Sequence, residues 1–218
     1  MTDAVGFLET IGLTPAMVAV DAMSKTSLIR VLQVELNDFY GVCVKIAGSV
    51  EAVSLAIRRG REVAARMNGR PVDDVISRLA PEAEGAVISP REYNPLIEQE
   101  VVFQVRTAGT GAESAASLDP TQSSMKDESQ GALGLIETQG FTAVFEAIDT
   151  ACKAASVRVI GKEKLGGGYV TVIIQGELSA VTTAVEAGSQ KVEGLGKLIA
   201  AHVIARPSEA VLSLLPRA

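Results

Sequence analysis

The chain contains one unit written twice, and this internal repeat constrains the fold more than any other feature of the sequence. Sliding the sequence on itself by 128 residues aligns segment 4–60 with segment 132–188 without a gap, and about a third of the aligned positions are identical. The identities include Gly6, Glu9, Thr10, Gly12 and Thr14 against Gly134, Glu137, Thr138, Gly140 and Thr142. In a chain of 218 residues such a repeat predicts two small domains of the same fold.

Beyond the aligned region the two copies are expected to differ in length. Matching the strand that ends at Ile88 with the strand that ends at Ile204 leaves 12 extra residues in the first copy, near 71–85. Within them, 72–79 has the pattern of a short amphipathic helix. Residues 107–131 are polar and small with no hydrophobic period, which is typical of a linker. The predicted organisation is domain 1–106, linker 107–131 and domain 132–218.

Both copies show the same order of predicted elements. A strand leads through a glycine into an apolar helix, at whose start Thr14 or Thr142 is expected to cap a helical N–H group. Two strands and an amphipathic helix follow, and a last strand is expected at 86–88 or 201–204. The order β-α-β-β-α-β predicts an α+β, ferredoxin-like domain with an antiparallel sheet. The first helix of each copy is apolar on nearly every side, which predicts burial on more than one face, one of them against another subunit.

Composition and charge exclude several classes of function. The formal net charge is −6 and no basic run interleaved with aromatic residues occurs, so nucleic acid is not an expected partner. The start of the chain, with Asp3, does not resemble a signal peptide, and no apolar run is long enough for a membrane span; a soluble cytosolic protein is expected. Cys43, Cys152 and the single His202 are far apart in sequence, which gives no support to a metal site or a disulfide, and no cofactor is expected.

Four stretches of the second copy carry a resemblance to a known family. They are Gly-Leu-Ile-Glu-Thr at 134–138, the helix segment 147–155, Lys-Leu-Gly-Gly-Gly-Tyr-Val-Thr-Val at 164–172, and Ala-His-Val-Ile-Ala-Arg-Pro at 201–207. Through them the second copy resembles the bacterial microcompartment (BMC) shell domain along nearly its whole length. The first copy looks like a divergent version, with Asn-Asp-Phe-Tyr at 37–40 in place of the glycine turn.

The resemblance implies a structural protein. Single-copy members of the family form flat hexamers with a central pore, which tile into the facets of a polyhedral shell around metabolic enzymes, and tandem members form trimers. For this chain it implies a homotrimer, alone or as stacked pairs, in the microcompartment shell of the bacterial cytoplasm. The implied partners are other shell proteins, both hexamers and pentamers, and small metabolites that cross the pore. Covalent pairing of neighbours in a six-domain ring leaves three-fold symmetry, which agrees with a trimer.

By the same resemblance, the turn after the second strand lines the pore. This assigns two sets of residues: Leu165, Gly166, Gly167 and Gly168 in the second copy, and Asn37, Asp38, Phe39 and Tyr40 in the first. Glycine suits such a turn because backbone N–H groups can approach a solute. We hypothesise that Phe39 narrows or plugs the pore and that Asp38 adds negative charge at its mouth. The alternative is that Phe39 and Tyr40 pack within their own subunit.

The resemblance also assigns residues to the edge between neighbouring oligomers. Lys25 and Lys153 correspond to the edge lysine of the family and Arg206 to its edge arginine, with Arg91 as a shifted counterpart in the first copy. The alternative for the two lysines is an ordinary i,i+4 ion pair on one helix, with Asp21 or Asp149, worth about 0.3–0.5 kcal/mol. His202 is expected to be a core or interface histidine.

Two other classes of protein remain as alternatives. An enzyme would need a nucleophile with a base, or clustered carboxylates, and the sequence shows neither at a recognisable spacing, so no catalytic residue is assigned. A Walker-type phosphate loop is absent around Lys164. The second alternative is a trimeric, ferredoxin-like regulatory protein that binds a small molecule. Such a protein would carry a long exposed loop between strands, whereas the turn here is short in both copies.

Overall fold

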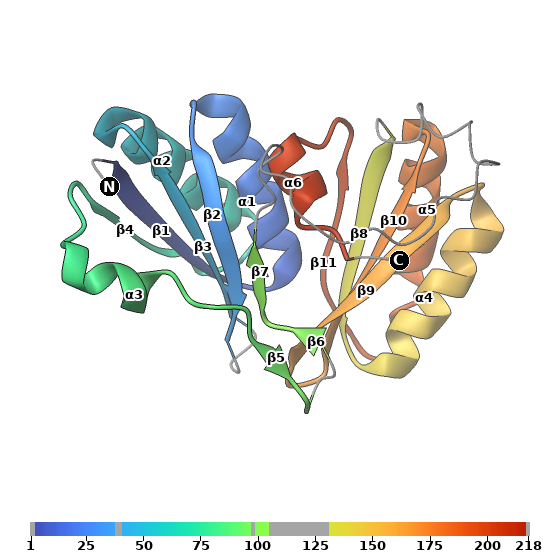
Figure 1. Cartoon of the computed structure of the whole chain (residues 1–218). Coiled ribbons are helices and arrows are strands. Elements are labelled where there is room, and N and C mark those ends of the chain that lie inside the picture. Colours follow the sequence, from blue (N-terminus) through green and yellow to red (C-terminus); the bar gives the residue numbers. More distant parts are fainter. Residues whose placement is uncertain (1–2, 38–40, 97–98, 105–130, 217–218) are drawn as a thin grey trace, which may run out of the picture.

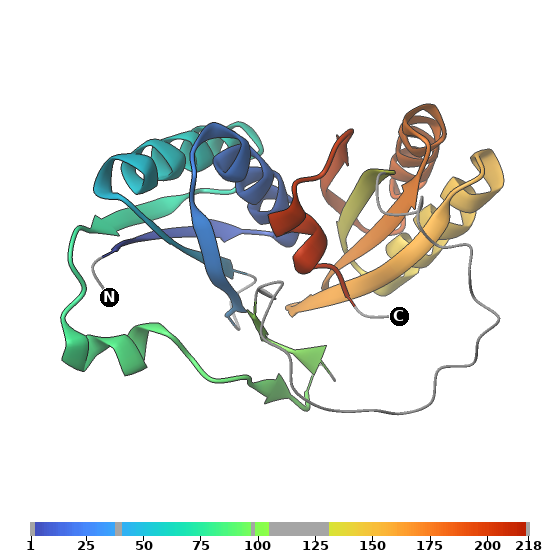
Figure 2. The same ribbon diagram turned by 45° about the horizontal axis from the view of Figure 1, so that its top comes forward.

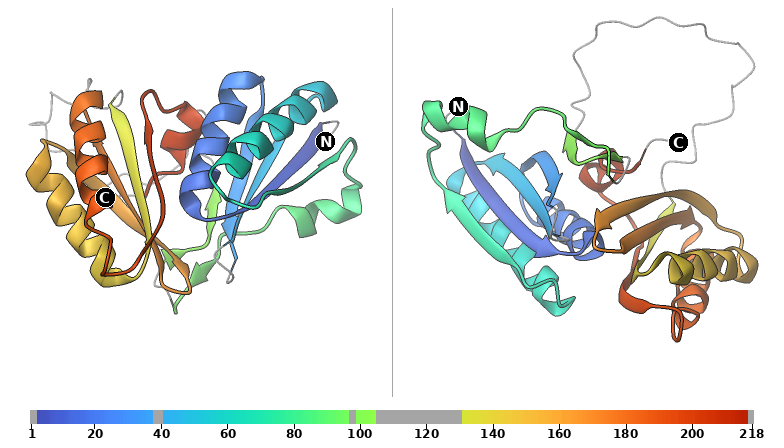
Figure 3. Two further views of the ribbon diagram at one scale, coloured as in Figure 1. Left: turned by 180° about the vertical axis from the view of Figure 1, so that it is seen from behind. Right: turned by 90° about the horizontal axis from the view of Figure 1, so that it is seen from below.

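The structure is a computed structural model that describes residues 3–37, 41–96, 99–104 and 131–216. Two units lie side by side, each with an antiparallel sheet and two helices packed on one of its faces (Figures 1 and 3). The first unit consists of β1 (Ala4–Ile11), α1 (Leu13–Thr26), β2 (Arg30–Leu36), β3 (Gly41–Gly48), α2 (Val50–Arg66) and β4 (Val72–Ile76). The second consists of β8 (Ala132–Gln139), α4 (Phe141–Ala154), β9 (Arg158–Gly166), β10 (Tyr169–Gly176), α5 (Leu178–Gln190) and β11 (Lys197–Ile204).

The two sheets have the same strand order and the same register. The orders are β4-β1-β3-β2 and β11-β8-β10-β9, and every pair is antiparallel. Val5 lies opposite Ile76 in the first sheet, and Leu133 lies opposite Ile204 in the second. Both of these pairs are related by the 128-residue offset seen in the sequence. The predicted fold class, two α+β ferredoxin-like domains in tandem, is therefore confirmed.

The predicted helix over 72–79 is wrong, and so is the predicted strand over 86–88. Residues Val72–Ile76 form the edge strand β4, which pairs with β1, while Glu84–Val87 form the short helix α3 after a 3-10 turn at Pro81–Ala83. The local pattern of 72–76 suits a helix or a strand, and pairing with β1 decides for the strand. Because β4 matches β11 at the offset of 128, the first copy has no insertion before its last strand.

After its last strand each unit continues into a short helix. In the second unit this is α6 (Glu209–Ser213), which lies between the two units and packs on α1 (Figures 1 and 2). In the first unit it is α3, followed by three short strands that have no counterpart: β5 (Tyr93–Asn94), β6 (Gln99–Glu100) and β7 (Val102–Gln104). β7 extends the first sheet beside β2, and β5 pairs with β6 as a hairpin. The expected linker, 107–131, lies outside the described residues except for its last residue.

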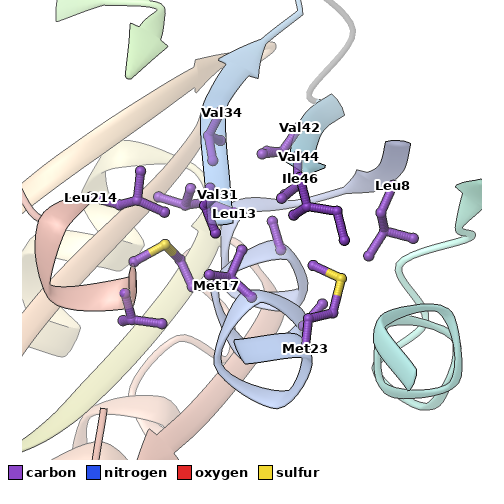
Figure 4. Close-up of a cluster of buried hydrophobic side chains, with 14 of the residues drawn as sticks. Leu8, Leu13, Met17, Met23, Val31, Val34, Val42, Val44, Ile46 and Leu214 are labelled. Atoms are coloured by element: carbon purple, nitrogen blue, oxygen red, sulfur yellow. The ribbon is translucent and has the colours of Figure 1, made fainter. Parts of the chain in front are cut away.

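Two hydrophobic clusters hold the units together, and the larger one crosses from one unit to the other. The smaller cluster fills the space between the second sheet and its helices. The larger cluster joins α1 and the first sheet to Leu133, Leu135 and Ile173 on the opposite face of the second sheet. Leu214, which follows α6, lies in this cluster with Leu13 and Met17 (Figure 4). The two repeats therefore share one core and form a single folded body.

Candidate functional site

The turn between β9 and β10 is made of three successive glycines in the left-handed region. Gly166, Gly167 and Gly168 have φ values of 81°, 55° and 81°. Residues with a Cβ rarely adopt this conformation, so the glycines are required by the shape of the turn. The turn is tied to the end of β8, because Gly140 N donates to Gly168 O at 2.8 Å and Gln139 Nε2 donates to Gly167 O at 3.2 Å.

The corresponding turn of the first repeat is held by Asn37. Gly41 N donates to Asn37 Oδ1 at 2.9 Å, and Asn37 N donates to Gly41 O at 3.0 Å. The side-chain amide of Asn37 also donates to Glu9 Oε1 at 2.8 Å, so the turn is linked to β1. The other predicted residues of this turn, Asp38, Phe39 and Tyr40, lie outside the described residues.

The two turns lie at the same end of the molecule, next to each other. A cavity of about 280 Å³ is lined by Leu36 and Asn37 of the first repeat, by Leu165 and Gly166 of the second, and by Asn94, Leu96 and Val101 of the connecting segment. The structure thus brings three of the predicted pore residues together, Asn37, Leu165 and Gly166. Leu165 itself is only 1% exposed and packs in the larger core cluster, so it supports the turn from inside.

The β5–β6 hairpin is fastened to this end of the second sheet. Both polar ends of the Gln99 amide bind the backbone of Lys164: Nε2 donates to the carbonyl oxygen at 2.6 Å, and Oε1 accepts from the amide at 3.0 Å. The amide thereby satisfies the unpaired edge of β9 immediately before the glycine turn. Sequence reasoning missed this hairpin, because two-residue strands give no periodic signal.

A buried carboxylate joins the two repeats at the start of α1. Glu137, which lies on β8 and is fully buried, accepts hydrogen bonds from Leu13 N and Thr14 N, both at 2.9 Å. These N–H groups have no acceptor within their own helix, so the carboxylate takes the place of a helix cap. The predicted cap by Thr14 is wrong: the N-cap is Gly12 at φ 91°, and the Glu137 oxygens lie 3.1–3.2 Å from where a Cβ of Gly12 would be. Burial raises the pKa of Glu137, and the hydrogen bonds from α1 oppose that shift.

Of the predicted edge residues, Lys25 and Arg206 contact each other, whereas Lys153 contacts only a residue of its own helix among those described. Lys25 Nζ donates to Asp21 at 2.6 Å and to the carbonyl oxygen of Arg206 at 2.5 Å, and Asp21 also accepts from Ser208 N at 2.8 Å. Lys25 and Arg206 are therefore brought together across the two repeats. Lys153 pairs with Asp149 of its own helix at 2.5 Å, and its side chain is 74% exposed.

Matching β4 with β11 also changes one assignment in the first repeat. The residue of the first repeat that corresponds to Arg206 is Arg78, at the offset of 128, and it is exposed. The expected counterpart, Arg91, is wrong because it depended on an insertion that the structure does not contain.

The reactive side chains among the described residues are next considered for their protonation and for metal binding. Burial raises the pKa of the Cys43 thiol to about 11, so the thiol stays protonated and unreactive at neutral pH. Burial also lowers the pKa of His202, which favours the neutral ring. Among the described residues, no group of three or more His, Cys, Asp or Glu side chains is placed to hold a metal ion, and none of the helices is long and apolar enough to cross a membrane.

The fold is thus a tandem of two like domains. Glu137 of the second repeat caps a helix of the first, and the two β-turns lie next to each other at one end. The sequence model of the BMC domain matches residues 4–78 and 132–207, which is more than half of the chain. The chain therefore belongs to the BMC domain family and carries two copies of the domain. The two matched ranges are of nearly equal length, which agrees with the absence of an insertion in the first copy.

Curated relatives match one domain at a time. The major carboxysome shell protein CsoS1A of Halothiobacillus neapolitanus is 48% identical over 95 residues, which are 43% of this chain and 97% of the relative. The carboxysome shell protein CsoS1 of Prochlorococcus marinus is 53% identical over 89 residues, 40% of this chain and 86% of the relative. Among solved structures, a microcompartment protein from Desulfitobacterium hafniense DCB covers 96% of this chain and 97% of its own at 22% identity, with a TM-score of 0.36.

Proposed function

We propose that this protein is a structural component of a bacterial microcompartment shell, and that three copies close into a ring of six BMC domains. The observation that carries the proposal is the contact between the two repeats. Glu137 of the second repeat caps α1 of the first, and the equivalent groups of the opposite ends, α4 and Glu9, are left at the surface. A head-to-tail contact whose two halves are both still available repeats from chain to chain, and it gives a ring when the rotation between neighbouring domains closes. Six like domains in pairs give three chains.

In this ring, the two kinds of turn alternate around a central pore. The turn of Gly166, Gly167 and Gly168 presents backbone groups to a solute, with no side chain in the way. The other turn starts at Asn37 and contributes Asp38, Phe39 and Tyr40, of which the sequence favours Phe39 as the residue that narrows the opening. The solutes are small metabolites, and the protein itself has no catalytic role in this proposal.

The rim of the ring provides the contacts with neighbouring tiles. Lys153 and Lys25 lie exposed in the last turns of α4 and α1, and Arg206 lies exposed just after β11. They are suited to contacts with other shell proteins, hexamers and pentamers, in the shell of a compartment in the bacterial cytoplasm. In this proposal the ring serves alone or as one of a stacked pair.

The native mass in solution tests the proposal. Light scattering or native mass spectrometry is expected to give the mass of three chains, or of six for a stacked pair, and electron microscopy of concentrated protein is expected to show flat sheets. A monomer or dimer at all concentrations would remove the ring, and with it the assignment of pore and rim. A trimer that never forms sheets and binds a small effector would favour a regulatory protein.

A further inference from the structure

The same helix of the repeat has two different surroundings in one chain. On α1, Leu13 and Met17 are 4% and 3% exposed, whereas their counterparts on α4, Phe141 and Phe145, are 41% and 51% exposed. The difference arises outside the repeat itself. α1 is covered by β8, β11 and α6 of the second repeat. The equivalent face of α4 is met by the side chain of Lys162 on β9, whose ammonium lies 5.5 Å from the centre of the Phe145 ring, and both phenylalanines stay exposed. The rings of Phe141 and Phe145, with centroids 6.0 Å apart, leave an exposed apolar surface at the start of α4.

The start of α4 has the same backbone geometry as the start of α1, but no side chain caps it. Its N-cap is Gly140 at φ 122°, as Gly12 at φ 91° is for α1, and neither glycine provides a side-chain cap. In α1 the first N–H groups donate to Glu137. Among the described residues, no acceptor meets the N–H groups of Phe141 and Thr142, which correspond to Leu13 and Thr14. Such groups need a partner in the assembled protein.

The surface that would complete this contact is present at the other end of the same chain. Glu9 occupies the position of Glu137 in the first repeat, and it is exposed. The segment after β4 also repeats the segment after β11. Gln33 hydrogen-bonds with Ser89 across the first sheet. At the corresponding Gly161 of the second sheet, a Cβ would meet Pro216, which follows α6. This places the Pro81–Val87 segment where α6 lies in the second repeat.

The side-chain sizes at the two contacts are complementary. In the contact within the chain, Leu13 and Met17 share one cluster with Val211 and Leu214 of the α6 segment. At the other contact, α4 offers the larger Phe141 and Phe145. The positions of Val211 and Leu214 are taken there by the smaller Ala83 and Ala86. The larger side chains on α4 therefore offset part of the volume that is lost on the alanine side, in the direction that a tightly packed interface requires.

We propose that the contact between chains is a second copy of the contact within the chain, with Glu9 as its acceptor. Phe141 N and Thr142 N of one chain donate to Glu9 of the next chain, and Phe141 and Phe145 pack on the next chain's α3 segment. At the rim, Lys153 and Asp149 bind the backbone at Arg78 and Ala80, as Lys25 and Asp21 bind it at Arg206 and Ser208. This inference rests on the proposed ring and names the groups that close it.

The same carboxylate reaches the pore turn. Glu9 Oε1 accepts from the Asn37 amide, and the other end of that amide accepts from Gly41 N. A carboxylate has about four lone-pair sites, so Glu9 can hold Asn37 and the two N–H groups of α4 together. Closing the ring therefore fixes Glu9, and through Asn37 it fixes the start and the end of the turn in the first repeat.

Two variants and their mixture test the contact. Glu9→Arg puts a positive charge at the positive end of a helix, and Phe145→Glu puts a charge into the apolar surface. Each is expected to raise the dissociation constant of the ring about 100-fold, while the circular dichroism of the separated chains stays that of the folded protein. Glu186→Arg, a charge reversal on the exposed face of α5, is the control that leaves the ring intact.

A mixture of the two variants distinguishes the proposed contact from any other interface between chains. A Glu9→Arg chain still has an intact α4, and a Phe145→Glu chain still has an intact Glu9, so an equimolar mixture is expected to form dimers of one chain of each kind that cannot close. Native mass spectrometry reads this directly. Variants that remain trimers would overturn the assignment of the contact and leave the ring standing. A wild-type chain that is monomeric at all concentrations would instead overturn the ring.

Discussion

Glu163 and Glu35 occupy the same position in the two repeats, but only Glu35 has a basic partner. Lys45 Nζ lies 2.8 Å from Glu35, and the position of Lys45 is taken by Ile173 in the second repeat. Glu163 is 6% exposed, and among the described residues it has neither an ion pair nor a hydrogen bond. Burial raises the pKa of Glu163 to about 7. A carboxyl group of this kind is more easily protonated in the folded state than in the unfolded state.

The pH dependence of stability follows from this shift. Between the ordinary carboxyl pKa and about 7, the folded chain keeps a proton that the unfolded chain has lost, so the free energy of unfolding falls as the pH rises through that window. Glu163→Gln is expected to stabilise the protein by about 1–3 kcal/mol at pH 8 and by almost nothing at pH 4. Denaturant unfolding at both pH values measures this.

The control for this prediction is the paired residue of the first repeat. Glu35→Gln leaves Lys45 buried without its ion-pair partner, so this variant is expected to lose stability at pH 8. Equal effects of the two substitutions, in the same direction, would contradict the difference between the repeats.

At the scale of the elements, the sequence predicts the helices and strands that recur in both repeats. It does not predict features that depend on contacts between distant segments. The strands and helices of both repeats follow from their periodicity, and the glycine turn of 166–168 from its composition. The strand β4 is not predicted, because its five residues carry no decisive pattern and the apolar segment 86–88 resembles the last strand more closely. The role of Glu137 was also missed, although its recurrence as Glu9 in the aligned repeat was a signal. A buried carboxylate that caps a helix 124 residues away leaves no local trace.

A substitution next to helix α6 tests how much the second repeat contributes to the core of the first. Leu214 is 6% exposed and lies with Leu13 and Met17 in the shared cluster. Leu214→Ala is expected to lower the free energy of unfolding by about 2–4 kcal/mol, because it leaves a cavity in that cluster. Leu96→Ala, at a position 91% exposed, is the matched control and is expected to change stability by less than about 0.5 kcal/mol. Equal small effects would show that α6 does not complete the core.

For the whole molecule, the shared core makes the two repeats one body even without a covalent connection. A protease site inserted into the expected linker, 107–131, allows the chain to be cut after folding. The two fragments are expected to stay together on gel filtration, because β8, β11 and α6 cover α1 and Glu137 stays buried against it. Separation of the fragments under native conditions would contradict a common core. A Glu137→Lys variant is the control in which the fragments are expected to part.

In the proposed ring, the unequal side chains at the start of α1 and α4 would also determine the order of the domains. If first repeats followed one another, Leu13 and Met17 would face Ala83 and Ala86 and leave cavities. If second repeats followed one another, Phe141 and Phe145 would crowd against Val211 and Leu214. Strict alternation avoids both penalties. In the proposed ring, the sequence would thus select the neighbour of each domain, and this selectivity would disfavour rings of six first repeats or of six second repeats.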